Sequence, residues 1–321
     1  MQRSDMKGLT QAKEAILKAD TVAMGCHVNP DGDAIGSMLS LGLGLEKLGK
    51  KVFMVSQDGV PRRYRPLPGA DRITRKLEND ADLAVTVDCS TREMLGGAYR
   101  DLRRSRTLLE IDHHEVRNSF GDIRYVDAEA PAVGEMIYCL LKELKVKINK
   151  DIAQNILTSL IVETNSFKLP NVRPFTFEVC AEMVKTGLDF YKLVDMVFWS
   201  HSRQVAVLSG ICLARCEFID GGRLAWSIVK REDFRKVNGK DEDADTIADE
   251  IRTIKGVDIV VFFREKSGEE LRVSLRSKGG INVARLAQEY GGGGHSDVAG
   301  CIIPNSGGKM EELLGKAEAL L

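Results

Sequence analysis

The chain has 321 residues, which is long enough for two domains of roughly 150 residues each. Its apolar fraction of 43% and its charged fraction of 29% are those of an ordinary soluble globular protein. The net charge of −1 predicts no general attraction to nucleic acid, although it leaves room for a local basic patch.

Two further features favour a cytoplasmic location without membrane contact. No window holds the ~18 uncharged apolar residues that a membrane span requires, and residues 1–7 lack the apolar core of a signal peptide. Seven cysteines are scattered without a CxxC pair, and several lie in apolar runs, as expected for reduced, buried thiols. Cys212 and Cys216 could bind a metal, but no second pair accompanies them.

Apolar runs alternate with helical stretches over the first part of the chain. This alternation favours an α/β domain with a mostly parallel sheet covered by helices on both faces. The predicted strands are residues 21–26, 52–56, 83–87 and 107–111, the predicted helices are residues 11–19 and 34–48, and a proline-containing loop spans residues 60–69.

Helices are predicted to dominate next, and from about Leu208 short apolar runs separated by polar turns indicate a smaller α+β domain. We expect a first domain at residues 1–187, a helical connector at 188–207 that includes a structural His201, and a second domain at 208–321. The predicted elements are helices at 133–144, 151–162, 175–185 and 191–199, strands at 224–229, 257–263 and 271–275, and helices at 245–254, 283–290 and 309–321.

Four aspartates follow the apolar runs of the first domain or end them. In a parallel sheet those strand ends meet at one edge, so the carboxylates would converge with two histidines. Carboxylates packed so closely cannot all ionise without compensation, and bound cations supply it. The alternative for any single aspartate is an ordinary loop residue or helix cap. The residues of this set are Asp31, Asp33, Asp88, Asp112, His27 and His113.

The ligand types favour particular cations. Carboxylates with imidazoles and no thiolate favour Mn²⁺ or Mg²⁺, while Zn²⁺, Co²⁺ and Fe²⁺ stay open. Enough ligands are present for two ions, and two ions roughly 3.5–4 Å apart that share a carboxylate and a hydroxide are the usual device for attacking phosphorus. The sequence therefore predicts phosphoryl chemistry with two divalent cations.

A second constellation lies near the end of the chain. Arg276 can form two hydrogen bonds to a phosphate, and the four glycines at 291–294 let the backbone approach an anion before His295. Asn282 either contacts the ligand or caps the helix that it precedes. The alternative is a glycine-rich surface turn with an isolated histidine. The arginines at 100–106 and 62–65 are expected to be solvated.

Three motifs in this order resemble a known family. The stretch HVNPDGDAIGS at residues 27–37, Asp112-His113-His114 and GGGGHSDVAG at residues 291–300 are similar to motifs of the DHH/DHHA1 phosphoesterases. Within that family the chain resembles the two-domain nano-RNase/pAp-phosphatase (NrnA-like) type from about residue 8 to the end. The resemblance implies a Rossmann-like DHH domain that faces a smaller DHHA1 domain across a cleft, with two Mn²⁺ ions on the DHH side.

The resemblance also implies roles for single residues. His27 and Asp31 would bind one ion, Asp33 and His113 the other, and Asp88 would bridge both. Asp112 would orient its neighbours, and His114 would contact the scissile phosphate or protonate the leaving oxygen. From the DHHA1 side, the substrate's far phosphate or terminal nucleotide would be bound by Arg276, Gly293, Gly294 and His295.

The sequence departs from the family's usual motifs at two places. Glu163 stands where an Asp usually completes the second ion's shell, and Asn165 stands where a glycine is usual. Because Asn tolerates left-handed backbone angles best after glycine, we expect such a conformation at Asn165. Ala132 and Val133 stand where small hydroxyl residues commonly precede Gly134.

The expected function is a metal-dependent phosphoesterase for small nucleotides. The candidate substrates are short oligoribonucleotides, linear or cyclic dinucleotides and 3′-phosphoadenosine 5′-phosphate (pAp), which a metal-bridging hydroxide would attack in line. The alternatives are a polyphosphate or pyrophosphate hydrolase, and a non-catalytic nucleotide sensor. Mg²⁺ or Co²⁺ could replace Mn²⁺, and a homodimer is one assembly that the sequence allows.

Overall fold

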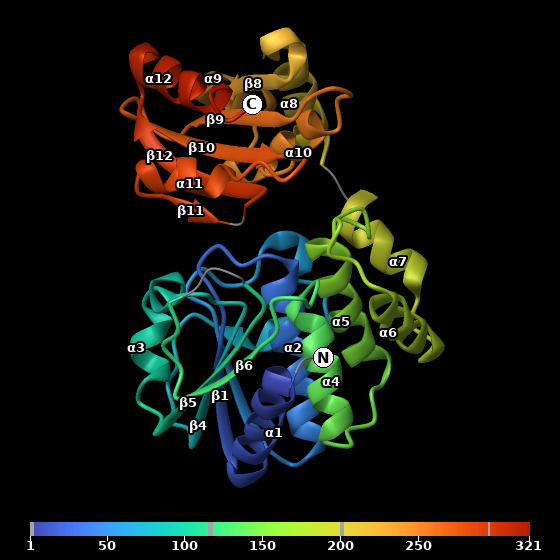
Figure 1. The fold of residues 1–321 in the computed structure, drawn as a ribbon. Helices are drawn as coiled ribbons and strands as arrows, with labels where there is room; N and C mark the ends of the chain where they lie inside the picture. The colour runs from blue at the N-terminus through green and yellow to red at the C-terminus, as the bar shows by residue number, and fades with distance from the viewer. Residues whose placement is uncertain (1–2, 115–117, 200–201, 295) are drawn as a thin grey trace. The chain divides into compact units, whose positions relative to one another are not determined.

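The computed structural model describes residues 3–114, 118–199, 202–294 and 296–321. The chain divides into two compact units, Met1–Ser200 and His201–Leu321, each with its own sheet (Figure 1). Among the described helices, none has both the length and the apolar character needed to cross a membrane.

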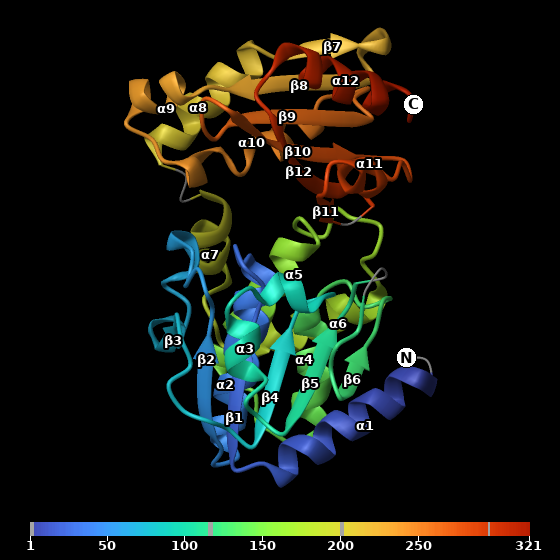
Figure 2. The same ribbon diagram turned by 90° about the vertical axis from the view of Figure 1, so that its left-hand side faces the viewer.

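The first unit is built on a six-stranded sheet whose neighbouring strands are all parallel. Its strand order is β3-β2-β1-β4-β5-β6. The chain therefore runs from β1 through β2 to β3 at one edge, and then from β4 through β5 to β6 at the opposite edge. Figure 2 shows these strands side by side with their carboxyl ends at one edge of the sheet. This arrangement confirms the predicted parallel α/β fold. The strands are β1 (Thr21–Gly25), β2 (Lys51–Val55), β3 (Ile73–Thr74), β4 (Leu83–Val87), β5 (Thr107–Asp112) and β6 (Ile123–Val126).

Helices cover both faces of this sheet. The larger core lies beneath three helices that pack on one another, α2 (Gly32–Lys47), α4 (Val133–Glu143) and α5 (Lys150–Glu163). The short helix α3 (Ala98–Leu102) covers the other face over a smaller core (Figure 1). The unit also contains α1 (Arg3–Lys18), α6 (Pro174–Lys185), α7 (Phe190–Val194) and a π-helical turn at Asp195–Trp199.

Two details of the sequence prediction were wrong in this unit. The first helix begins at Arg3, so it is longer than the predicted 11–19, and two edge strands, β3 and β6, were missed. β3 has only two residues, and β6 carries the exposed Arg124 between half-buried and buried neighbours. Edge strands bury less surface than central strands, so they lack the continuous apolar runs that identified β1, β4 and β5.

The second unit has a mixed six-stranded sheet with the order β11-β12-β10-β9-β8-β7. Its central strand β9 is buried on both faces. Val261 and Phe263 pack into one core, and Val260 and Phe262 pack into another. The strands are β7 (Glu217–Ile219), β8 (Leu224–Val229), β9 (Ile259–Glu265), β10 (Glu270–Ser277), β11 (Gly293–Gly294) and β12 (Val298–Pro304), and the helices are α8 (Arg203–Ala214), α9 (Arg231–Val237), α10 (Ile247–Arg252), α11 (Val283–Glu289) and α12 (Gly307–Glu318).

The close contact of α2 with α5 gives a test of this packing. A Cβ added at Gly36 would lie 2.5 Å from the carbonyl oxygen of Asn155 and 3.1 Å from the amide nitrogen of Ser159, so the backbones would have to separate. Gly36→Ala should therefore lower the free energy of unfolding by about 2 kcal/mol. Gly210→Ala, at an exposed position of α8 where a Cβ meets nothing within 4 Å, should instead raise it by about 0.5–1 kcal/mol. Urea denaturation followed by circular dichroism measures both changes, and equal effects would contradict the packing argument.

Candidate metal centre

The loop that follows β1 holds the first two candidate ligands. Asp31 is the N-cap of α2, and its Oδ1 accepts hydrogen bonds from the amides of Asp33 (2.9 Å) and Ala34 (3.0 Å). The loop is also held from outside, because the amide of Asn29 donates to Asp58 Oδ2 (2.7 Å). Asp31 Oδ1 lies 3.9 Å from His27 Nε2, so Asp31 serves as a helix cap while its carboxylate faces the histidine.

Asp88 occupies the centre of the site, directly after β4. It has a positive φ of 58° and is 3% exposed. Its Oδ2 lies 3.4 Å from His27 Nε2, while its Oδ1 lies 3.6 Å from His113 Nε2 and 3.7 Å from His114 Nδ1. Burial raises the pKa of Asp88, but the hydrogen bond with His27 and the charges of the three histidines outweigh it and hold the pKa below its usual range.

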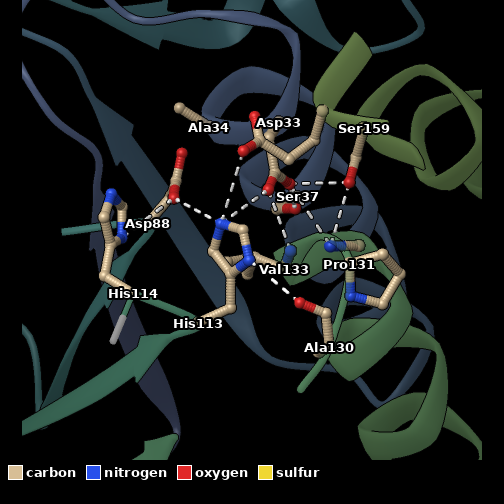
Figure 3. A network of polar contacts seen from close by, with 12 residues as sticks. Asp33, Ala34, Ser37, Asp88, His113, His114, Ala130, Pro131, Val133 and Ser159 are labelled. Atoms are coloured by element: carbon tan, nitrogen blue, oxygen red, sulfur yellow. Dashed lines mark hydrogen bonds and ion pairs between the residues drawn. The ribbon is translucent and has the colours of Figure 1, made fainter. Parts of the chain in front are cut away.

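His27 and His113 share one orientation. The Nδ1 of His27 lies 2.8 Å from the carbonyl oxygen of Val28, and the Nδ1 of His113 lies 3.1 Å from that of Ala130. Because a carbonyl oxygen only accepts, Nδ1 donates in both rings and Nε2 faces the carboxylates. Figure 3 shows His113 between Ala130 on one side and Asp33 and Asp88 on the other. A backbone carbonyl on one ring nitrogen, with the other directed into a carboxylate cluster, is the usual support of a metal-binding histidine.

The carboxylate of Asp33 is fully buried and receives four hydrogen bonds. Ser37 Oγ (2.8 Å), Ser159 Oγ (2.6 Å) and the amide of Gly134 (3.3 Å) donate to Oδ1, and the amide of Val133 (2.9 Å) donates to Oδ2. Burial and the charge of Asp88 raise the pKa of Asp33 to about 6, although His113 and Ser159 lower it.

Sequence reasoning missed all four of these donors. Ser37 stands four residues after Asp33 on the same helix, and that spacing could have identified it. Ser159 lies 126 residues away on α5, and no local pattern connects the two residues. Ala132 and Val133 lack hydroxyl groups that could donate to Asp33. The backbone amides of Val133 and Gly134, at the start of α4, donate to its carboxylate instead.

His114 and Asp112 form a separate pair beside the centre. His114 Nδ1 lies 2.7 Å from Oδ1 of the fully buried Asp112. Burial lowers the pKa of His114, but the hydrogen bond with Asp112 and the charge of Asp88 raise it to about 9. In the absence of cations, these contacts therefore favour the imidazolium form of His114, which can donate a proton.

Glu163, the last residue of α5, points towards the same centre. Its Oε1 lies 3.8 Å from His113 Nε2. The turn that follows is left-handed at three successive positions, Asn165 (φ 46°), Ser166 (φ 58°) and Phe167 (φ 62°), which agrees with the left-handed backbone expected at Asn165. The hydroxyl of Thr164 accepts from the amide of Phe167 (3.0 Å) and stabilises this turn.

These donors fit a pair of divalent cations. His27, Asp31 and Asp88 offer ligand atoms within 4.8 Å of one another, as do Asp88, His113 and His114, and both sets share Asp88; His114, however, already directs its Nδ1 to Asp112. Ligands that bind one ion at about 2.1 Å and at right angles lie roughly 3 Å apart. The separations of 3.4–3.9 Å between nitrogen and oxygen therefore need only a small contraction to hold an ion. Burial lowers the pKa of His27, but the hydrogen bonds and charges of Asp31 and Asp88 raise it well above its usual value, so positive charge is favoured at this place.

The predicted substrate residues of the second unit have varied surroundings. Arg276 directs its guanidinium to Asp249, with Nε–Oδ1 and Nη2–Oδ2 distances of 2.8 and 3.2 Å, so a phosphate would have to share or replace that partner. Asn282 caps α11 and accepts from the amides of Ala284 and Arg285, which matches the capping role left open by the sequence. His295 lies outside the described residues.

The glycine run forms part of the second sheet, since Gly293 and Gly294 constitute β11 and pair with β12. A Cβ at Gly292 or Gly294 would lie within 2.4 Å of a carbonyl oxygen of the 298–300 segment, and Gly291 has a positive φ of 72°. Gly293 has neither constraint, because its φ is not left-handed and a Cβ there would meet nothing within 4 Å. Packing therefore explains Gly292 and Gly294, and backbone conformation explains Gly291, whereas neither constraint applies to the exposed Gly293.

Comparison with known proteins covers nearly the whole chain. The profile of the DHH family N-terminal domain matches residues 21–162, and that of the DHHA1 domain matches residues 227–321. The bifunctional oligoribonuclease and PAP phosphatase NrnA of Thermus thermophilus is 30% identical over 90% of this chain and 86% of its own length. The protein of the same name from Bacillus subtilis is 27% identical over 97% and 98%. An exopolyphosphatase-related protein from Bacteroides fragilis has the same fold, with a TM-score of 0.90 and 23% identity over 97% of this chain and 95% of its own.

The position of Glu163 leads to a test of the centre. Because its carboxylate already reaches His113, Glu163→Gln and the shorter Glu163→Asp should each weaken one of two Mn²⁺ binding events about tenfold or more and leave the other nearly unchanged. Isothermal titration calorimetry with Mn²⁺ measures both affinities. Glu178→Gln, at an exposed position of α6, is the matched control. Unchanged affinities in both Glu163 variants would exclude this carboxylate from the centre.

Proposed function

This chain belongs to the DHH/DHHA1 phosphoesterases, and on that premise we propose that it hydrolyses short oligoribonucleotides, linear or cyclic dinucleotides and pAp. The names of the Thermus and Bacillus relatives support two of these substrates, oligoribonucleotides and pAp. The observation that carries the proposal is the position of Asp88, whose two oxygens face His27 on one side and His113 on the other.

Each side of Asp88 then has its own ligands. We assign His27 and Asp31 to one cation, and His113, Asp33 and Glu163 to the other. Carboxylate oxygens and neutral imidazoles favour Mn²⁺, and Mg²⁺ or Co²⁺ would be accepted by the same donors. When bound, two such cations lower the pKa of water and stabilise the charge that develops on the phosphoryl oxygens.

His114 is assigned to the leaving group. Its hydrogen bond to Asp112 fixes the ring through Nδ1 and keeps it protonated at neutral pH. Nε2 would then donate a proton to the oxygen that leaves phosphorus. Asp112 acts through His114, as an orienting partner that is fully buried.

The second unit would bind the far end of the substrate. The open face at Gly293 suits close approach of a phosphate or base, and we assign Gly294, Arg276 and His295 to the same subsite. Asn282 would act mainly by holding the start of α11 next to it.

All seven cysteines are free, which supports the proposed cytoplasmic location.

Asp88 also provides the decisive test. The isosteric Asp88→Asn keeps the shape of the side chain but removes the charge that faces both histidines, so turnover of pAp and of a 5′-phosphorylated RNA dinucleotide with Mn²⁺ should fall about 10³-fold or more. Phosphate release and chromatography of the products measure it. Asp71→Asn, at an exposed site of the same unit, should leave both rates unchanged.

Three outcomes would contradict the proposal. Near-normal rates in Asp88→Asn would exclude the central role of this carboxylate. Tight binding of nucleotide by the unaltered protein, with no phosphate or mononucleotide released in Mn²⁺, would instead favour the nucleotide sensor. Hydrolysis of pyrophosphate or polyphosphate without hydrolysis of nucleotides would favour the remaining alternative.

A further inference from the structure

Behind the metal centre, one arginine holds two buried carboxylates. Arg173, directly before α6, donates from Nε to Glu135 Oε1 (2.7 Å) and from Nη2 to Asp127 Oδ2 (3.3 Å). The side chains of Glu135 and Asp127 are only 1% and 6% exposed, and the hydroxyl of Thr176 donates to the other oxygen of Glu135 (2.7 Å). None of these residues belongs to the ligands assigned above.

The charges make Arg173 hard to replace. Two carboxylates with little exposure share one guanidinium, so its removal would leave two like charges without compensation. The guanidinium itself is within reach of solvent, since the side chain is 26% exposed and borders a cavity of about 270 Å³. The cavity is lined by Tyr125, Asp127, Glu135, Met136, Cys139, Arg173 and Phe175.

Asp127 begins the segment that orients His113. Its carboxylate accepts from the amide of Glu129 (3.0 Å), and its carbonyl oxygen accepts from the amide of Ala130 (3.1 Å). The carbonyl of Ala130 then accepts from His113 Nδ1 (3.1 Å). Only a tight turn therefore separates the carboxylate held by Arg173 from the atom that fixes the ring of His113.

Glu135 ends the same segment on the side of Asp33. It lies in the first turn of α4, directly after the amides of Val133 and Gly134 that donate to Asp33. Arg173 thus holds both ends of the segment 127–135, and this segment contacts two of the residues assigned to the second cation.

We propose that Arg173 is a positioning residue for the metal centre, which fixes the segment 127–135 so that His113 and Asp33 keep the geometry that binds the second cation. The inference rests on the proposed cation sites but needs no particular substrate. None of the hydrogen bonds described above joins this segment to His27 or Asp31. The affinity for the cation assigned to those two residues should therefore change far less.

The test is Mn²⁺ binding to the full chain, measured by isothermal titration calorimetry. Arg173→Ala should weaken one of the two binding events about tenfold or more and change the other by less than threefold. Guanidinium chloride at a low, non-denaturing concentration should restore part of the lost affinity by entering the cavity left by the side chain. Arg103→Ala, which removes an exposed arginine paired with Asp122 in the same unit, is the matched control and should change neither affinity.

A second variant keeps the test decisive if Arg173→Ala does not fold. Arg173→Lys retains the charge but loses the two-pronged geometry, so it should fold and still bind the second Mn²⁺ several-fold more weakly. Both affinities within twofold of the unaltered protein in the folded variants would overturn the proposal, as would an equal loss at both ions. If the unaltered protein binds two Mn²⁺ ions but hydrolyses no nucleotide, the proposed function fails while this inference stands.

Discussion

Repulsion among carboxylates at one edge of the parallel sheet is the constraint that shapes the first unit. Burial and the charge of Asp88 raise the pKa of Asp33, and both side chains lie where water cannot screen them. Two features of the fold compensate this repulsion: three imidazole rings surround Asp88, and four hydrogen-bond donors contact the carboxylate of Asp33. The strand order brings the ends of β1, β4 and β5 together and so creates the repulsion, which a pair of cations would relieve.

The three histidines differ in what holds them. Backbone carbonyls orient His27 and His113 through Nδ1, so that Nε2 of each ring faces the carboxylates as a potential metal ligand. A buried carboxylate orients His114 and keeps its proton in place. One residue type thus serves two purposes within a few ångströms, and the partner on Nδ1 decides between them.

Much of the fold of the first unit and of its candidate site could be predicted from the sequence, because the patterns that identify them are local in the chain. The buried runs of β1, β4 and β5 identified the central strands, and the acids and histidines directly after them converge as predicted. The donors to Asp33 could not be read in the same way, since Ser159 is distant along the chain. The same limit applies to Arg276, whose fork was predicted to bind phosphate and is directed to Asp249 on α10. Partners of this kind depend on tertiary packing, for which a single sequence carries no periodic signal.

The order of the assigned ligands along the chain has a consequence for biosynthesis. His27 and Asp31 come from the first strand–helix unit, whereas Glu163 ends α5, which packs on α2 through Gly36. A growing polypeptide therefore carries five of the six assigned ligands before Glu163, the sixth, leaves the ribosome at the end of α5. Until α5 has emerged and docked, the proposed second cation would lack one of its carboxylate ligands. On the proposed assignment, the ligand set of the second cation is thus completed only when α5 docks on α2.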